Sequence, residues 1–160
     1  MNPAADLERV YRRDFRQLVR VAAAVTSSEA AGAEAVQEAF LRLLRSRESY
    51  RSEGPVEAWV WRTVVNEAKR LAAREAGALA AAREEACENG SAGHDAATRA
   101  LVAALPERQR LAVFLRYYAD LDYRTIGQVL GIETGTVSAT LAAAHERLRG
   151  AIEGVLDDAS

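Results

Sequence analysis

The sequence predicts an all-α protein of two small helical domains joined by a flexible linker. Three observations indicate this. Apolar residues recur at helical spacing along most of the 160 residues, only three prolines interrupt the good helix formers, and a Gly/Ser/Asn cluster breaks the pattern near the middle. We expect the domains at residues 1–75 and 98–156, with an acidic, flexible linker at 76–97 that is partly helical at first.

The first domain is expected to hold three helices. Residues 6–25 carry apolar side chains at helical spacing, and the segment "TSSEAAG" then ends that helix. Ser27 or Ser28 is available to cap a second helix that runs to about residue 46. After the loop "SRESYRSEGP", a glycine, a proline and an early acid predict a third helix that runs to about Arg74.

The second domain is expected to open near Asp95 and to continue as a chain of short helices. Pro106 begins a new helix, and Asp122 can cap a short one at residues 123–130. A glycine then supplies a tight turn before a longer helix at residues 134–149. Two helices joined in this way are typical of a helix-turn-helix.

Composition excludes several classes of protein. The single cysteine, Cys87, rules out an internal disulfide or a cysteine-based zinc site, and no apolar run approaches a membrane span. The charged N-terminus is unlike a secretory signal, so we expect a cytoplasmic protein. His94 and His145 have no nucleophile or metal-ligand spacing around them, and no Gly-rich phosphate loop occurs. The sequence therefore predicts no enzyme, no cofactor and no metal.

The formal net charge of −2 is unevenly distributed. Residues 1–75 hold 13 Lys and Arg against 11 Asp and Glu, residues 76–98 hold one against four, and residues 99–160 hold seven against eight. A phosphate-binding surface must therefore be local, because the field of the whole molecule supplies little attraction.

The third helix carries the best candidate for such a surface. Arg62, Asn66, Arg70 and Arg74 recur every four residues and share one face, with Lys69 beside them. Aromatic residues at the start of the helix, and a loop before it, suit unstacked bases. The candidate nucleic-acid residues of this domain are Tyr50, Arg51, Ser52, Trp59, Arg62, Asn66, Lys69, Arg70 and Arg74.

Three segments resemble one family, the bacterial RNA polymerase sigma factors of the sigma-70 type, in the small extracytoplasmic-function (ECF) group. The segment "AEAVQEAFLRLL" is similar to the polymerase-binding part of sigma region 2, and "YRSEGPVEAWVWRTVVNEAKRLAAR" to the part that opens and reads the −10 element. The segment "ALPERQRLAVFLRYYADLDYRTIGQVLGIETGTV" resembles sigma region 4. The resemblance as a whole covers nearly the entire chain except the linker.

The resemblance implies a transcription initiation factor without catalytic chemistry, whose partners are core RNA polymerase and promoter DNA, with an anti-sigma factor as a further candidate. It implies that the loop at residues 50–54 holds a flipped base, and that the acidic linker follows the RNA path. The polymerase β′ clamp would be met by Glu34, Gln37, Glu38, Phe40 and Leu41. The second domain would bind the β flap and read the −35 element through Arg124, Thr134, Thr136, Ser138, Thr140 and His145.

The chain departs from the family pattern in its recognition helix. After "GTV" the run "SATLAAAHER" lacks the usual cations, and Glu133 stands where a serine is usual. Fewer phosphate contacts mean a weaker grip on the −35 element. Two alternatives therefore stay open: a sigma-like polymerase-binding regulator with impaired −35 recognition, and a stand-alone helix-turn-helix regulator.

Overall fold

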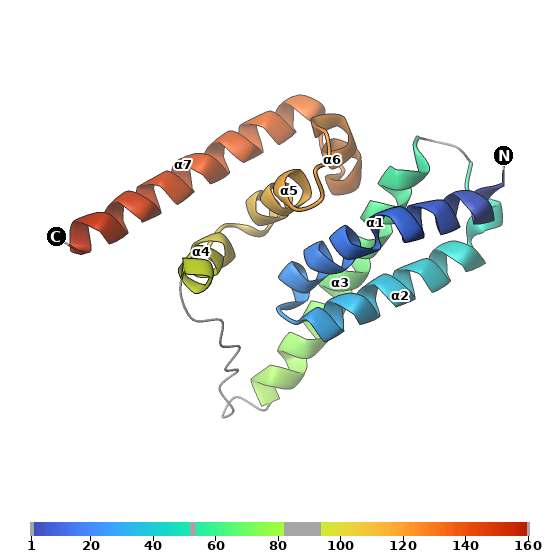
Figure 1. Cartoon of the computed structure of the whole chain (residues 1–160), viewed down its shortest axis with the longest axis horizontal. Coiled ribbons are helices and arrows are strands. Elements are labelled where there is room, and N and C mark those ends of the chain that lie inside the picture. The colour runs from blue at the N-terminus through green and yellow to red at the C-terminus, as the bar shows by residue number, and fades with distance from the viewer. Residues whose placement is uncertain (1, 52–53, 82–93, 160) are drawn as a thin grey trace.

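The computed structural model describes residues 2–51, 54–81 and 94–159, except for the side chains of residues 78–81, 94–96 and 99. Every regular element in this part of the chain is a helix, which confirms the predicted all-α class with two helical domains (Figure 1). The first domain consists of α1 (Pro3–Thr26), α2 (Glu29–Arg45), the short 3-10 helix η1 (Arg47–Ser49) and α3 (Val56–Ala81). The second consists of α4 (His94–Ala103), α5 (Glu107–Tyr117), α6 (Tyr123–Leu130) and α7 (Thr134–Asp158).

Local capping explains where the first two helices begin. The Asn2 side chain accepts hydrogen bonds from the backbone N–H groups of Ala4 and Ala5, and a proline follows it, so α1 starts three residues before the expected Asp6. Ser28 caps α2 by accepting from the Ala31 N–H at 3.0 Å. The capping role therefore belongs to Ser28 of the two candidate serines.

Two helices run further than the sequence pattern predicts. α3 continues past Arg74 to Ala81, because the alanine-rich segment after it favours a helix and Gly77 alone does not end one. α7 continues past Arg149 to Asp158, where Ile152, Val155 and Leu156 keep helical spacing although they are exposed. The α7 extension lacks a buried stripe, which is the signal that the prediction relied on.

The core of the first domain lies among α1, α2 and α3. Trp61 is its largest fully buried side chain, packed with Leu7, Leu18 and Leu43 in the same cluster. In the second domain, Leu111, Leu115, Ile126, Val137 and Leu141 join α5, α6 and α7. The buried residues of α1, α2 and α3 recur at helical spacing, whereas α5 is buried at five consecutive positions, Leu111 to Leu115.

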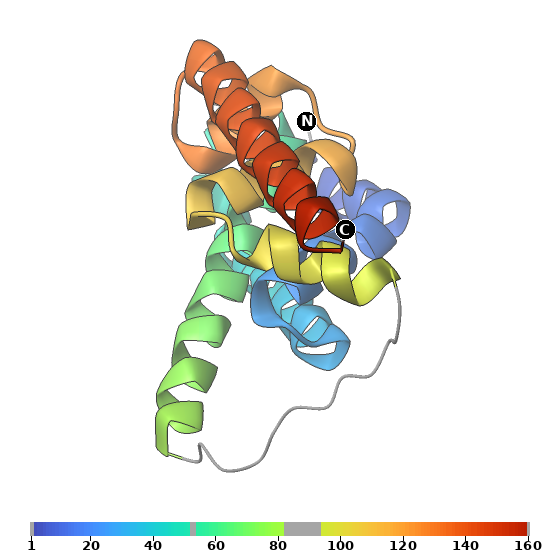
Figure 2. The same cartoon turned by 90° about the vertical axis from the view of Figure 1, so that its left-hand side faces the viewer.

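The two domains also pack against each other. α3 contacts α6, and α1 contacts α5, as the two views in Figures 1 and 2 agree. In the described part of the chain, no helix is both long and apolar enough to cross a membrane. The contact between α3 and α6 bears directly on the candidate site, because α3 carries the predicted DNA-binding row.

Gly32 permits α1 and α2 to pack closely, and this generates the first prediction. A Cβ at this position would lie 2.5 Å from the Ala23 backbone N and 2.8 Å from its Cα. We expect Gly32→Ala to lower the free energy of unfolding by ~1–3 kcal/mol, because backbone atoms cannot give way as a side chain can.

Urea unfolding measures this, with Gly150→Ala as the control. Gly150 is exposed near the C-terminal end of α7, and a Cβ added there would have no atom within 4 Å. Alanine at this position should therefore raise the free energy of unfolding by ~0.5–1 kcal/mol. Equal effects of the two substitutions would contradict the close packing of α1 on α2.

Candidate nucleic-acid interface

The predicted polar row lies on the outer face of α3. Val60, Val64 and Ala68 are fully buried on the opposite side, which turns residues at positions 62, 66, 70 and 74 outward. All four of these side chains are exposed, and Lys69 is half-buried beside them. The structure therefore brings the predicted row together on one surface.

An aromatic pair stands at the N-terminal end of this row. The Tyr50 and Trp59 rings stack with centroids 4.7 Å apart and 18° between their planes. The Tyr50 hydroxyl donates to the Gly54 carbonyl at 2.6 Å, and Gly54 has a φ of +116°, which favours glycine. Burial raises the pKa of Tyr50, so its hydroxyl keeps the proton that this bond uses. The loop is thus closed on itself, with one ring against Trp59.

The remaining residues predicted in this region differ in placement. Arg51 is exposed, whereas Ser52 lies outside the described residues. Trp61 is only 1% exposed, so it belongs to the core of the first domain. The half-buried Trp59 is therefore the tryptophan that the site can use.

Glu67 is a buried acid that was not predicted from the sequence. Its carboxylate Oε1 lies 2.7 Å from the Arg42 Nε on α2 and 3.2 Å from the Arg70 Nη1. Its side chain is only 7% exposed, so it links α2 to the polar row from inside the domain. A signal existed in the sequence: Glu67 follows Val60 and Val64 on the apolar stripe of α3, where a carboxylate needs a cationic partner.

The residues predicted to bind polymerase lie mostly on the exposed face of α2. Glu34, Gln37, Glu38 and Leu41 are exposed, and Leu41 is 45% accessible. Phe40 points inward instead, with its ring edge-on to Tyr11 at 4.7 Å and 81°. Phe40 therefore packs in the core beneath α2 and does not form part of the exposed surface.

The second domain covers part of the α3 row. Arg62 donates from Nε at 3.0 Å and from Nη2 at 2.5 Å to the backbone carbonyl of Gln128 on α6. That carbonyl is one of the last four of α6, which have no partner within the helix, so a guanidinium there is favourable. Lys69 Nζ also lies 3.7 Å from Glu107 of α5. Neither Gln128 nor Glu107 could be found from sequence, because each acts on a distant segment.

The helix-turn-helix of the second domain forms where it was predicted. Asp122 caps α6 by accepting the Thr125 N–H at 2.7 Å, and Gly131 ends the helix with a φ of +69°. A Cβ on Gly127 would lie 2.7 Å from the Ile132 carbonyl, so a glycine is needed for the turn to fold back on α6. These local features set α7 across α6.

Two of the predicted −35 residues already have partners. The Thr140 hydroxyl donates to the Thr136 carbonyl at 2.7 Å, and His145 Nε2 lies 2.8 Å from the Tyr117 hydroxyl. Arg124, Thr134, Thr136 and Ser138 are exposed. Glu133 makes no side-chain capping hydrogen bond at the start of α7, in keeping with its departure from the family pattern.

No cluster suited to a metal ion occurs among the described residues, where no three His, Cys, Asp or Glu side chains come together. Cys87 and three of the four linker acids lie outside those residues, and Asp95 has no described side chain. The described surface therefore offers cations, hydroxyls and aromatic rings, which suit a polyanion.

Comparisons with known proteins agree on one family. The family model of Sigma-70 region 2 matches residues 10–77, and that of Sigma-70, region 4 matches residues 96–148. The chain is 28% identical over 145 residues to the ECF RNA polymerase sigma factor SigM of Mycobacterium tuberculosis, covering 88% of this chain and 74% of that protein. It is 26% identical over 142 residues to the ECF RNA polymerase sigma-E factor of Escherichia coli, covering 77% of this chain and 74% of that protein.

Two solved structures share the fold. CnrH, solved in complex with the cytosolic domain of CnrY, superposes with a TM-score of 0.71 at 18% identity, over 92% of this chain and 88% of that one. The sigma factor RpoE of Bartonella quintana, solved with the anti-sigma factor NepR, gives 0.71 at 16% identity, over 92% and 97% of the two chains. At these identities the likeness shows the arrangement of helices.

The cap at Asp122 generates a pH-dependent prediction. The hydrogen bond from the Thr125 N–H holds the pKa of this carboxyl below its ordinary value of 3.8. Because the folded pKa is lowered, the stabilisation is complete above pH 3.8 and is lost as the pH falls through the folded value. At near-neutral pH, Asp122→Ala should therefore lower the free energy of unfolding by about 1 kcal/mol.

Thermal unfolding followed by circular dichroism measures the effect near neutrality and at a pH well below 3.8. Asp122→Asn is the matched control, since asparagine caps without a titrating group and should cost little at either pH. If Asp122→Ala lowers the stability by the same amount at both pH values, the cap does not depend on the charge of Asp122.

Proposed function

Since the chain belongs to the extracytoplasmic-function group of the sigma-70 family, we propose that its two domains divide promoter recognition between them. The protein is a transcription initiation factor that binds core RNA polymerase and directs it to promoters. The domain of residues 1–75 holds the polymerase clamp and opens the −10 element. The domain of residues 98–156 binds the flap and reads the −35 element, with residues 76–97 between them.

The observation that carries this proposal is the polar row of α3 ending at the stacked Tyr50 and Trp59 rings. Cations that follow a strand by its phosphates, next to aromatic faces for its bases, are the usual means of holding single-stranded DNA. Extruding a base costs a few kcal/mol, which the stacking and phosphate contacts return. For a base to enter, Tyr50 must move off Trp59 or the base must stack on the outside of the pair.

The exposed face of α2 supports the proposed polymerase contact. Leu41 and Leu44 are 45% and 39% exposed, and they lie among the polar residues Gln37 and Glu38. Apolar side chains within a polar rim are typical of a protein-binding surface. The ion pair between the exposed Arg42 and the buried Glu67 ties this face to α3, so the proposed polymerase-binding and DNA-binding surfaces are linked directly.

Among the residues proposed to contact the −35 element, Arg124 is the one cation outside α7, and the remaining contacts rest on hydroxyls and backbone N–H groups. Thr134, Thr136 and Ser138 are exposed in the first turns of α7, where the N–H groups of a helix attract phosphate. His145 is held by Tyr117. With so few cations, the second domain would be positioned only weakly on duplex DNA. This weakness supports a second candidate function, a polymerase-binding regulator with impaired −35 recognition.

The protein acts without catalytic chemistry of its own, in the cytoplasm where polymerase lies. An anti-sigma factor is a further partner, since the structural relative RpoE was solved bound to one. Such a partner would recognise the same exposed surfaces that polymerase and DNA use.

Promoter binding through α3 requires the domains to separate. Arg62 and Lys69 are proposed to contact DNA, yet both are engaged with the second domain, at the Gln128 carbonyl and at Glu107. The arrangement in which the two domains pack together, which we call the closed arrangement, therefore competes with DNA for the same cations. A ligand that binds only the open form has its apparent affinity reduced by the fraction of chains that are open.

Two substitutions of one ion pair should change DNA binding in opposite directions. Glu107→Gln removes the partner of Lys69 and favours opening, so binding of a single-stranded −10 oligonucleotide by the whole chain should tighten by up to about fivefold. Lys69→Gln removes the same pair and also a DNA contact, so binding should weaken. Fluorescence anisotropy measures both.

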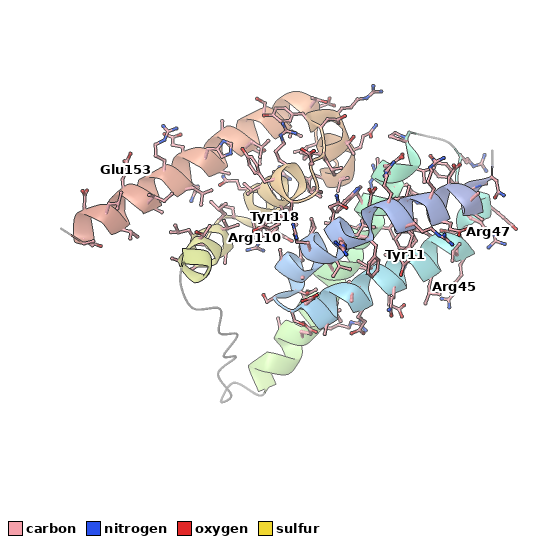
Figure 3. All side chains as sticks on the ribbon, in the orientation of Figure 1. Tyr11, Arg45, Arg47, Arg110, Tyr118 and Glu153 are labelled. Atoms are coloured by element: carbon pink, nitrogen blue, oxygen red, sulfur yellow. The ribbon has the colours of Figure 1, made fainter. Side chains whose placement is uncertain are left out.

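Glu153→Gln is the control for the change in charge, because Glu153 lies on the part of α7 that projects away from the first domain (Figure 3). If Glu107→Gln binds no better than this control, the closed arrangement does not compete with DNA.

Transcription in vitro tests the function itself. Core bacterial RNA polymerase is given host genomic DNA with and without this protein, and the 5′ ends of the RNA are sequenced. We expect new start sites that share a sharp −10 motif and a less defined −35 motif. If the protein co-purifies with the core enzyme but yields no new starts, the polymerase-binding regulator is the correct assignment.

A further inference from the structure

The outer face of α1 carries five arginines that no part of the proposed promoter contact uses. All five are exposed, and they recur at helical spacing along one side of the helix. We call them the α1 arginine row: Arg9, Arg12, Arg13, Arg16 and Arg20. The buried face of α1 holds Val10, Leu18 and Val21 against the core, so the row is fixed in an outward direction.

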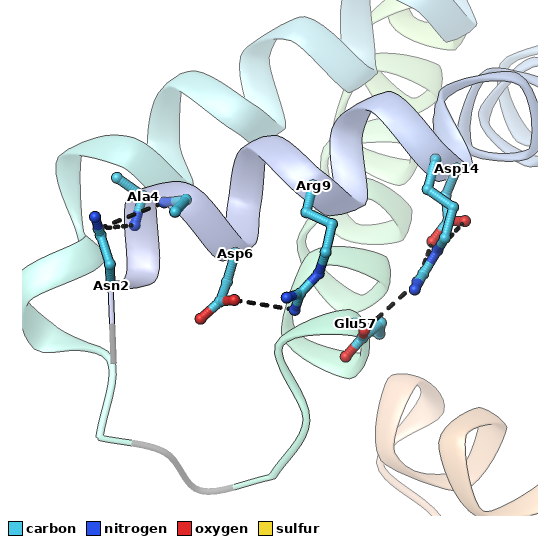
Figure 4. Close-up of polar contacts among 8 residues, drawn as sticks. Asn2, Ala4, Asp6, Arg9, Asp14 and Glu57 are labelled. Carbon is cyan, nitrogen blue, oxygen red and sulfur yellow. Dashed lines mark hydrogen bonds and ion pairs between the residues drawn. The ribbon is translucent and has the colours of Figure 1, made fainter.

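Carboxylates accompany only the first part of the row. Arg9 pairs with Asp6 at 3.0 Å, and Arg12 pairs with Glu8 at 2.8 Å. Arg13 pairs with Asp14 at 2.8 Å. Figure 4 shows the pair of Arg9 with Asp6 and the contacts at Asp14 and Glu57. Arg16 and Arg20 have no carboxylate within ion-pair distance in the described part of the chain. Positive charge is therefore unbalanced toward the C-terminal end of the row.

A shallow hollow of about 520 Å³ lies along this end. Its lining consists of Arg12, Arg13, Phe15, Arg16, Gln17 and Arg20, with no acidic residue among them. Phe15 is partly exposed there, and its ring lies 5.0 Å from that of Tyr11, which fixes its orientation. The hollow thus combines four guanidinium groups, one amide and one aromatic ring.

We propose that the α1 arginine row is a second nucleic-acid site, which binds the phosphodiester backbone of the strand held at the Tyr50 and Trp59 pair. The inference rests on the proposed function, because it assigns the continuation of the same DNA strand to α1. Arg12, Arg16 and Arg20 stand at steps of ~6 Å along the helix, and each guanidinium can form two parallel hydrogen bonds to one phosphate.

The two surfaces are joined by a direct contact. Arg13 Nη2 lies 3.4 Å from Glu57 Oε1, in the first turn of α3 and two residues before Trp59. Figure 4 places Glu57 beside the ion pairs of α1. This ion pair places the start of the row next to the first turn of α3, where Glu57 and Asp14 neutralise Arg13. A strand that leaves the aromatic pair would pass these carboxylates and reach the unpaired cations at Arg16 and Arg20.

Nucleic acid fits the hollow better than an acidic peptide does. A carboxylate-rich peptide would need only the charges, whereas the half-buried Phe15 adds aromatic surface beside cations, which suits a nucleobase. Gln17 adds both a donor and an acceptor for a base edge. The probe of choice is therefore single-stranded DNA.

The test removes the two arginines that lack carboxylate partners. The double variant Arg16→Gln with Arg20→Gln keeps good helix formers at exposed positions, so the fold should be unchanged by circular dichroism. We measure binding of a fluorescent single-stranded oligonucleotide, long enough to span both surfaces, by the whole chain over a range of salt concentrations. The slope of log affinity against log salt should fall by about 1.4, at about 0.7 for each lost phosphate contact.

Matched variants separate this effect from general charge. Arg108→Gln with Arg149→Gln makes the same change in net charge at exposed positions of the second domain and should leave the slope unchanged. Arg9→Gln should have a smaller effect, because Asp6 already neutralises that side chain. If the α1 double variant matches the Arg108 and Arg149 control, the inference is overturned.

Failure of this inference can be distinguished from failure of the proposed function, because the two are measured separately. Start-site mapping with polymerase reports on promoter recognition, whereas oligonucleotide binding by the free chain reports on the row. A double variant that keeps its full DNA affinity but loses binding to a polyglutamate peptide would replace the nucleic-acid site by a site for acidic protein.

Discussion

The rotation of α3 about its own axis decides where the other functional surfaces of the chain lie. Its inner face buries Val60, Trp61 and Val64 against α1 and α2, and a helix of 3.6 residues per turn must then present its polar row on the other side. Glu67 strengthens this constraint, because a carboxylate that is 7% exposed cannot turn away from its two arginine partners without losing them. The polymerase-facing helix α2 and the DNA-facing row are therefore set by one packing arrangement.

Local patterns could be predicted from sequence, and contacts between distant segments could not. The span of α6 and its cap at Asp122 were predicted correctly because both depend on residues within one turn. The ends of α3 and α7 were set too early: α3 continues through alanine-rich sequence, and α7 continues although its last two turns are exposed. The contact of Arg62 with the Gln128 carbonyl and the pairing of Glu67 with Arg42 join segments at no fixed spacing in the sequence. Neither could therefore be predicted without the structure.

The placement of the ion pairs explains how a chain with a negative net charge can present a cationic surface. A chain with a net charge of −2 can still bind a polyanion when its carboxylates are placed beside some arginines and withheld from others. Asp6 and Glu8 neutralise the start of α1, whereas Arg16 and Arg20 remain unpaired within the described residues. The recognition helix α7 has no comparable group in its first turns. In the proposed promoter complex, the first domain would therefore supply most of the affinity for DNA, and the second mainly hydroxyl and backbone contacts.

The closed arrangement of the domains is suited to being opened by a partner. Arg62 occupies a C-terminal carbonyl of α6 that water can satisfy equally well, so breaking this bond costs about 0.5–1.5 kcal/mol rather than the cost of a buried group. The pair of Lys69 and Glu107, at 3.7 Å and largely in solvent, contributes less than about 1 kcal/mol. DNA phosphates offer Arg62 a charged acceptor in place of a neutral one, which is the stronger hydrogen bond. In the proposed complex the same guanidinium would therefore stabilise the DNA-bound form more strongly than it stabilises the closed form.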